Sequence, residues 1–157
     1  MKKTFEDFAK KIKTKEELIF YLEEIAQVRQ IIFKDNEASL SKKVEGKVSG
    51  EFKKFLERLE KEEVISKNPG QQSSFFQELE KYLKSLPEIK LEIAFSPDDN
   101  SLYRISQWLE KELGQKIILD LIINPRVVGG AIIEYRGNWR DFSLAKKIDQ
   151  LISQKNQ

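Results

Sequence analysis

Apolar residues in the first half of the chain recur every three or four positions. Phe5, Phe8 and Ile12 form one such row, and Phe52, Phe55 and Leu59 form part of another. This spacing places side chains on one face of an α-helix. We therefore predict a bundle of about four to six helices, with helical stretches near residues 4–12, 15–34, 52–67 and 74–86.

Polar residues at the starts of these rows predict where the helices begin. Thr14 and Glu17 form a capping box, in which the two side chains bond the orphan backbone N–H groups of the first turn. Ser74 and Gln77 have the same spacing, so we expect the last helix of the bundle to begin at Ser74. Residues 68–70, Asn-Pro-Gly, form a strong turn signal ahead of it.

The spacing of the apolar residues changes after Pro87. Residues 89–93 alternate between apolar and charged, which predicts a half-buried strand. Ser96 is then expected to cap a helix that ends at Gly114, a residue type that favours helix termination. The remaining pattern predicts strands at 116–123 and 131–135, turns at 124–125 and 136–138, and a last helix that begins at Ser143.

The order of these elements predicts an α+β protein of two domains. Helices come first, and a small mixed strand–helix–strand–strand–helix segment follows. We place the boundary near Pro87, so that residues 1–86 form the helical bundle and residues 87–157 form the small α/β domain. Domains of this size bury little surface and often depend on partners for stability.

Charge and composition argue against two classes of function. The 28 Lys and Arg residues nearly balance the 26 Asp and Glu residues. Basic runs such as Lys42-Lys43 are short and interleaved with acids, which is typical of a solvated helix face rather than a nucleic-acid surface. No apolar run approaches the roughly 20 residues of a membrane helix, and no secretory signal is recognisable. We expect no nucleic-acid partner and no direct membrane insertion.

The residue types that carry most enzyme chemistry are missing from the sequence. There is no His and no Cys, which removes the usual general base near neutral pH and the commonest metal ligands. Residues 46–49 lack most of a P-loop, and Gly129-Gly130 lacks the further glycine of a dinucleotide fingerprint. We therefore expect no catalytic residue, no cofactor, no metal and no small-molecule substrate.

A stretch in the second half resembles a known family. Pro125, Gly129 and Gly130, followed by Asp141 and Ser143, are similar to the C-terminal signature of the delta subunit of F-type ATP synthase. This family is called oligomycin-sensitivity-conferring protein in mitochondria. Its signature is an Asp-Pro-x-Leu-x-Gly-Gly stretch, a strand, and an Asp-Gly-Ser step that opens a basic terminal helix.

The chain departs from this signature at three positions. Asn124 and Val127 stand where the family has Asp and Leu, and Phe142 replaces the Gly between Asp141 and Ser143. The resemblance is clearest over residues 89–152. The first half resembles the family only loosely, through the FLxxL stretch at 55–59, and it lacks the usual opening helix of the six-helix bundle.

The resemblance implies a non-catalytic subunit of the peripheral stalk, bound to the cytoplasmic face of an energy-transducing membrane. In the family, the helical bundle grips N-terminal segments of the alpha subunits, and the C-terminal part binds the C-terminal helices of the b subunits. The family protein thereby resists torque during proton-driven ATP synthesis. For the head contact we predict Phe5, Phe8, Ile12, Phe52, Phe55 and Leu59, and for the stalk contact Leu144, Ile148 and Leu151.

Other interpretations of the residues stay open at this point. The same apolar rows are typical of an ordinary core. A helical adaptor of another pathway, with no link to ATP synthase, would share the two small domains and the balanced charge. An enzyme that acts through carboxylates would require converging acids with perturbed pKa values.

Overall fold

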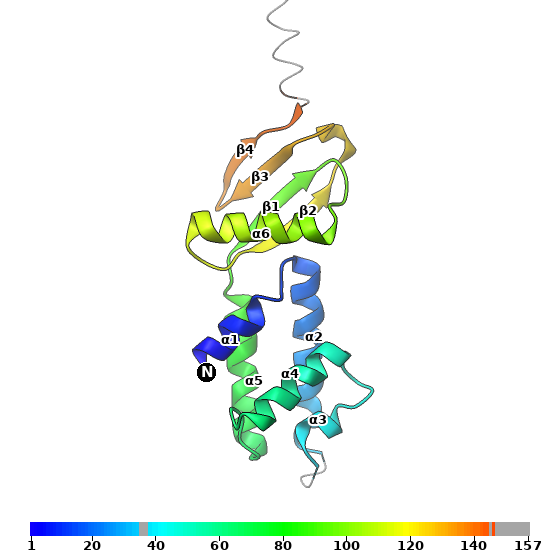
Figure 1. Ribbon diagram of the computed structural model, residues 1–157, viewed down its shortest axis with the longest axis vertical. Coiled ribbons are helices and arrows are strands. Elements are labelled where there is room, and N and C mark those ends of the chain that lie inside the picture. The colour runs from blue at the N-terminus through cyan, green and yellow to red at the C-terminus, as the bar shows by residue number, and fades with distance from the viewer. Residues whose placement is uncertain (35–37, 145, 147–157) are drawn as a thin grey trace, which may run out of the picture. The chain divides into compact units, whose positions relative to one another are not determined.

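The computed structural model describes residues 1–34, 38–144 and 146, which form two compact units (Figure 1). The first unit holds residues 1–11 and 17–85, and the second holds residues 12–16 and the chain from Leu86 onward. Helices and one four-stranded sheet make up the fold, so the predicted α+β class is confirmed. That residues 1–86 and 87–157 fold as separate domains stays a prediction.

The first unit is a helical bundle built around aromatic side chains. Its helices are α1 (Lys2–Ala9), α2 (Lys15–Ile31), α3 (Leu40–Lys43), α4 (Gly50–Lys61) and α5 (Pro69–Lys84). The ring centre of Phe8 lies 4.4 Å from that of Phe55 and 5.8 Å from that of Phe52. Aromatic pairs of this kind add to the energy gained from burial alone. The buried Glu24 accepts hydrogen bonds from the backbone and hydroxyl of Ser49, which caps α4.

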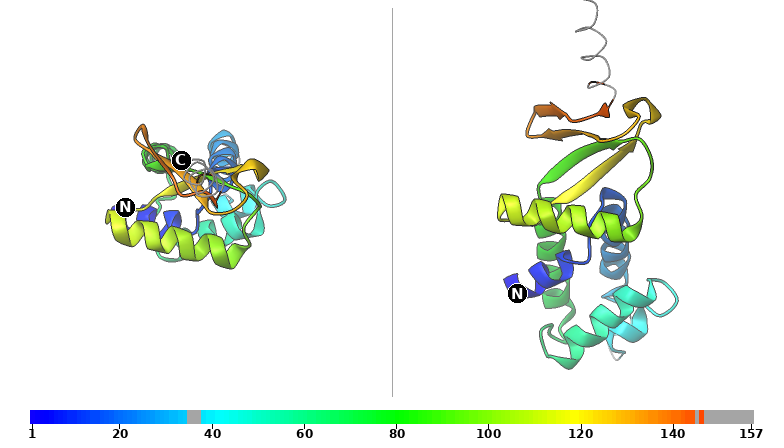
Figure 2. Two further views of the ribbon diagram at one scale, coloured as in Figure 1. Left: turned by 90° about the horizontal axis from the view of Figure 1, so that it is seen from above. Right: turned by 45° about the horizontal axis from the view of Figure 1, so that its top comes forward.

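The second unit contains a sheet with the strand order β2-β1-β3-β4. Strand β1 (Glu88–Ile93) pairs in parallel with β2 (Ile118–Ile123) and antiparallel with β3 (Ala131–Tyr135), which pairs with β4 (Asn138–Asp141). Helix α6 (Asp99–Leu113) connects β1 to β2 and lies across the strands (Figure 2). The short 3-10 helix η1 (Pro125–Val127) follows β2.

One apolar face of this sheet packs against α6. Strand register places Ile89 beside Leu119, and these two side chains form a buried core with Ile117 and with Leu109 of α6. On β1, the opposite face carries the charged residues Glu88, Lys90 and Glu92, because successive side chains of a strand point to opposite faces. Apolar and charged residues of β2 and β3 lie beside them. Lys90 on that face forms an ion pair with Glu134 of the neighbouring strand, with the charged atoms 3.2 Å apart.

Two helices begin at residues other than those predicted. Helix α5 begins at Pro69 rather than at Ser74, because the side chain of Asn68 accepts hydrogen bonds from the N–H groups of Gly70 and Gln71 at 2.9 and 3.1 Å. An Asn cap followed by Pro is a strong helix start. Helix α6 is capped by Asp98, whose carboxylate accepts the N–H of Ser101 at 2.7 Å, and not by Ser96.

Strand β4 was not predicted from the sequence. It forms a hairpin with β3 through Arg136 and Gly137, whose φ angles of 52° and 78° fit a two-residue turn between twisted strands. All four residues of β4 are exposed, so the strand lacks the apolar alternation that marks a half-buried strand. Within the described residues, no helix is both long enough and apolar enough to span a membrane.

Candidate functional site

The six residues predicted to contact a partner from the first half of the sequence are buried. Phe5, Phe8, Phe52, Phe55 and Leu59 pack inside the first unit, and Ile12 is buried in the second. A partner can reach such side chains only by displacing their neighbours. Their role as contacts stays a prediction, and a partner helix meets other apolar side chains first.

An exposed apolar row runs along α2. Ile19, Leu22 and Ala26, together with Phe33 just beyond the helix, follow at intervals of three, four and seven residues, which places them on one side of a helix. Ile19 is 48% exposed and Phe33 is 63% exposed. We call these four residues the α2 row. It shares its helix with buried Leu18, Ile25 and Val28, so α2 is apolar on two sides.

The residues of the second half that resemble the family signature lie near the carboxyl ends of β1 and β2. Pro125 begins η1 directly after β2, and the side chain of Asn124 accepts the N–H of Arg126 at 3.0 Å. Residues 142–144 return alongside residues 129–131, because the Phe142 N–H donates to the carbonyl of Ala131 at 2.8 Å. Residues 142–144 therefore continue the pairing of β3 with β4 beyond the ends of the two strands.

Gly130 is required by this close approach of two backbones, whereas Gly129 faces a flexible side chain. A Cβ atom on Gly130 would lie 2.3 Å from the carbonyl oxygen of Phe142, and Gly130 also has a φ of 78°. A Cβ atom on Gly129 would lie 2.8 Å from the Leu144 side chain. Gly130 thus has a structural role, because it leaves room for the backbone of residues 142–143.

Asp141 and Ser143 form the turn that follows β4. The Asp141 carboxylate accepts the N–H of Ser143 at 2.8 Å, and the Ser143 hydroxyl accepts the N–H of Lys146 at 3.3 Å. Hydrogen bonds from the hydroxyl and the backbone of Ser143 hold the pKa of Asp141 below its usual range. Both residues act as local caps, in which a short polar side chain satisfies nearby backbone donors.

The apolar face of the sheet is covered at one end only. Ile89 and Leu91 on β1 are 2% and 4% exposed, whereas Ile123 at the end of β2 is 48% exposed. In register, Ile93 lies beside Ile123 on one side and beside Ala131 on the other. We call Ile93, Ile123 and Ala131 the open sheet end.

The loops beyond the open sheet end are also apolar and exposed. Their large exposed side chains are Phe95, Val128, Phe142 and Leu144. Val128 has a φ of 65°, which is rare and costly for a β-branched residue. Such strain is found preferentially where a protein binds something. Leu144 was predicted as a stalk contact and is exposed; Ile148 and Leu151, predicted with it, lie outside the described residues.

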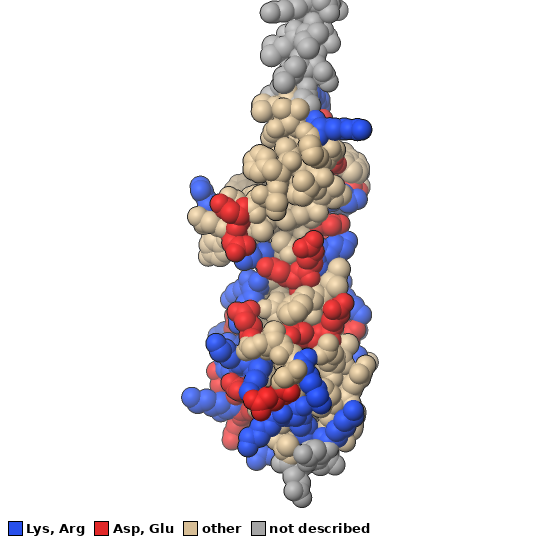
Figure 3. All heavy atoms as spheres, turned by 90° about the vertical axis from the view of Figure 1, so that its right-hand side faces the viewer, with Lys and Arg blue, Asp and Glu red and all other residues tan. Residues whose placement is uncertain are grey.

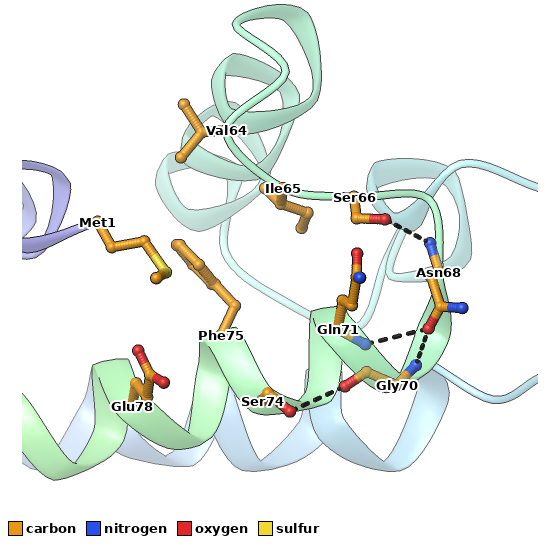
Figure 4. A pocket seen from close by; sticks show the side chains of 10 residues that line it. All are labelled: Met1, Val64, Ile65, Ser66, Asn68, Gly70, Gln71, Ser74, Phe75 and Glu78. Atoms are coloured by element: carbon orange, nitrogen blue, oxygen red, sulfur yellow. Dashed lines mark hydrogen bonds between the residues drawn. The ribbon is translucent and has the colours of Figure 1, made fainter.

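A shallow hollow in the first unit has a structural explanation. It has a volume of about 460 Å³ and is lined by Met1, Phe75 and the turn between α4 and α5 (Figure 4). Its polar groups serve to start α5, since Asn68 caps the helix and the Ser74 hydroxyl donates to the carbonyl of Gly70 at 3.1 Å. Among the described residues, no group of three or more acids could hold a metal ion.

Charged side chains of both signs are interleaved on the surface. On the face drawn in Figure 3, Lys and Arg are mixed with Asp and Glu over the lower and middle parts of the view, and the upper part is largely uncharged. Many of them pair, as Arg29 does with Glu80 at 2.6 Å and Lys53 with Glu45 at 2.6 Å. Apolar surface, rather than charge, therefore distinguishes the α2 row and the open sheet end from their surroundings.

These features define a class of α+β protein in which a helical bundle precedes a small mixed sheet and both units carry exposed apolar residues. The particular family follows from the sequence as a whole, since the model of the family described as "ATP synthase delta (OSCP) subunit" matches residues 1–154. The chain belongs to this family. It is therefore a peripheral-stalk subunit of an F-type ATP synthase and associates with that complex.

Solved structures with a similar chain include two ATP synthases. A chain in the cryo-EM structure of the Polytomella F-ATP synthase is 23% identical, with a TM-score of 0.39, over 46% of this chain and 92% of that one. A chain of the Toxoplasma gondii mitochondrial ATP synthase hexamer is 11% identical, with a TM-score of 0.40, over 91% of this chain and 88% of that one. A search of curated protein sequences finds no match.

The first prediction concerns Gly130. Replacing it with Ala should lower the free energy of unfolding by about 3–5 kcal/mol, because the substitution combines a left-handed backbone with a clash. Gly137→Ala is the matched control, since Gly137 has the same φ but nothing within 4 Å of its added Cβ atom; it should cost about 1–2 kcal/mol. Urea unfolding measures both, and equal losses would contradict the close approach at Gly130.

The second prediction concerns the pH dependence of the Asp141 turn. A carboxyl with a lowered pKa stabilises the folded state above its ordinary value of 3.8, and this contribution is lost as the pH falls through the lowered pKa. The amide NMR signal of Ser143 should therefore shift at a pH below 3.8. Asp141→Asn retains the acceptor oxygen and should abolish that shift. A Ser143 signal that titrates equally in both proteins would contradict the assignment.

Proposed function

We propose that this chain links the catalytic head of a rotary F-type ATP synthase to its membrane-anchored b subunits, and so resists torque during proton-driven ATP synthesis. The observation that carries the proposal is the match of the family model to nearly the whole chain, residues 1–154. In this role the chain is a structural component with no active site of its own, bound peripherally at the cytoplasmic face of the energy-transducing membrane.

The proposed partner of the first unit is an N-terminal segment of the alpha subunit. The α2 row supports this assignment, because an amphipathic partner helix needs a line of apolar side chains at helical spacing. Ile19 and Phe33 are large, exposed and surrounded by polar residues such as Glu23 and Gln30. Buried residues such as Phe52 and Phe55 then stabilise the bundle that carries the α2 row.

The proposed partner of the second unit is the C-terminal helix of a b subunit. The open sheet end supports this assignment, since it is a continuation of the face that already packs against a helix, α6. A second amphipathic helix beside α6 would bury Ile123 and Ile93 as α6 buries Ile89 and Leu119. Large exposed side chains in the adjoining loops, among them Phe142 and Leu144, would extend the contact.

The third prediction tests the function as a whole. The tagged chain should retain alpha, beta and b subunits in stable proportion when it is captured from detergent-solubilised membranes of its own organism. Mass spectrometry of the captured proteins provides the measurement. The absence of all three, under conditions that keep the synthase intact, would contradict the proposal and favour an adaptor of another pathway.

The fourth prediction tests the open sheet end with neighbouring residues that point to opposite faces. Ile123→Asp should weaken binding of a peptide that spans the C-terminal helix of the b protein at least tenfold, or by about 1.4 kcal/mol or more, because it buries an unpaired charge in the interface. Ile122→Asp is the control, since Ile122 is 38% exposed but lies on the other face of the sheet.

Calorimetric titration of the peptide into the full chain measures both affinities, after circular dichroism has established that the variants fold. Equal affinities for Ile123→Asp and Ile122→Asp would exclude the open sheet end as the stalk contact. A larger loss with Ile122→Asp would move the contact to the opposite face of the sheet, which carries Ile122.

A further inference from the structure

The loop between β2 and β3 contains a strained turn centred on Val128. The φ and ψ angles of Val128 are 65° and −47°, and the Gly129 N–H donates to the carbonyl of Val127 at 2.7 Å. A hydrogen bond of this span around a positive φ defines the rare and strained form of the γ-turn. A positive φ is costly for any residue with a Cβ atom and most of all for a β-branched one. Val128 is therefore held in a backbone conformation that its own side chain opposes.

Burial within the protein offsets little of this strain. The Val128 side chain is 60% exposed, whereas that of the preceding residue, Val127, is 2% exposed. A buried valine would be stabilised by the apolar surface that it removes from water, and a side chain this exposed gains only a part of that energy. Strained conformations of this kind are found preferentially where a protein binds another molecule. The turn thus fixes Val127 inward and presents Val128 to solvent.

Leu144 extends the apolar surface beside this turn. Its N–H donates to the carbonyl of Gly129 at 2.8 Å. Its side chain lies against Gly129, where an added Cβ atom would be 2.8 Å from it. Leu144 is itself 46% exposed, so an exposed apolar side chain lies against the residue that follows Val128. We call Val128 and Leu144 the apolar tip.

Two cations adjoin the apolar tip. Arg126 lies two residues before Val128 and Lys146 two residues after Leu144, and both line a hollow of about 370 Å³. Neither forms an ion pair with another residue that the structure describes. Asp141 also lines the hollow, but its carboxylate accepts hydrogen bonds within its own turn. The surroundings of the tip therefore complement a partner that carries acidic side chains beside its apolar ones.

We propose that Val128 is an anchor residue, which the γ-turn holds outward so that it inserts between apolar side chains of the C-terminal helix of the b subunit. This inference rests on the proposed function, which supplies the partner, and it assigns the central contact to one side chain. Acidic residues beside the apolar face of that helix would meet Arg126 and Lys146. A strained but fixed turn suits an anchor, because a side chain that is already in place loses little conformational entropy on binding.

The fifth prediction is that stability and binding change in opposite directions at residue 128. Val128→Gly should raise the Tm by about 2–4 °C, because the relief of the positive φ outweighs the greater freedom of glycine in the unfolded chain. The same variant should weaken binding of a peptide that spans the C-terminal helix of the b protein about five- to tenfold, because it removes the apolar anchor.

Two further variants separate the side chain from the backbone. Val128→Ala keeps a Cβ atom at the positive φ, so it should weaken binding to a similar extent and raise the Tm less. Glu63→Gly is the matched control, because Glu63 is exposed and has a φ of 53° but lies after α4 in the first unit. It should raise the Tm as Val128→Gly does and leave the affinity for the peptide unchanged.

Calorimetric titration of the peptide into the chain measures the affinities, and thermal unfolding followed by circular dichroism measures the Tm. Native affinity in Val128→Gly or Val128→Ala would overturn the anchor. A Tm below the native value in Val128→Gly would do the same, since the turn would then carry no strain. An equal loss of affinity in Glu63→Gly would also overturn it, because the effect would not be specific to the tip.

The proposed function fails in a different way. A native chain that neither binds the peptide nor joins the synthase would overturn the function and, with it, the anchor. A native chain that binds the peptide as tightly as both Val128 variants do would overturn the anchor and leave the function intact.

Discussion

The backbone at Gly130 passes so close to that at Phe142 that no side chain fits between them, and the carboxyl end of the sheet depends on this contact. A Cβ atom there would lie 2.3 Å from the Phe142 carbonyl oxygen. Because the contact forms, the chain after β4 pairs with residues 129–131. Asp141 and Ser143 therefore lie close to the segment that follows Pro125. The exposed apolar residues around Ile123 are the surface that this arrangement leaves uncovered.

The sequence contains enough information to predict the fold class and the position of the glycine pair after the second predicted strand. Helical spacing before Pro87 and alternation after it are strong patterns, and the glycine pair indicates a backbone constraint even without coordinates. Helix starts were less predictable. Ser74 and Asn68 are both good caps, and the choice between them depends on which backbone N–H groups the chain leaves unpaired. Strand β4 gave no signal because none of its residues is buried.

The division of apolar residues into core and surface could not be predicted from spacing alone. Phe52 and Ile19 both belong to rows of helical period, yet one is buried and the other is 48% exposed. A helix with one apolar side reveals its inward face, but α2 is apolar on two sides, and sequence spacing does not say which side the bundle covers. In the sheet, Ile89 and Ile123 lie on the same face, and only the position of α6 decides which is covered.

In the proposed function, the two apolar surfaces attach the chain to other subunits of a rotary enzyme. Each unit presents exposed apolar residues, the α2 row in the first and the open sheet end in the second. Family membership supplies the complex in which these features act. The aromatic core around Phe8 and Phe55 stabilises the bundle that carries the α2 row.

In the proposed function, the α2 row and the open sheet end bind different subunits. The most direct test replaces Ile19 and, in a second protein, Ile123 with a photo-crosslinking amino acid and irradiates the assembled synthase. The crosslinked product from position 19 should contain the alpha subunit, and the product from position 123 should contain a b subunit. Products with the same partner from both positions, or no product from a chain shown to be in the complex, would contradict this proposal.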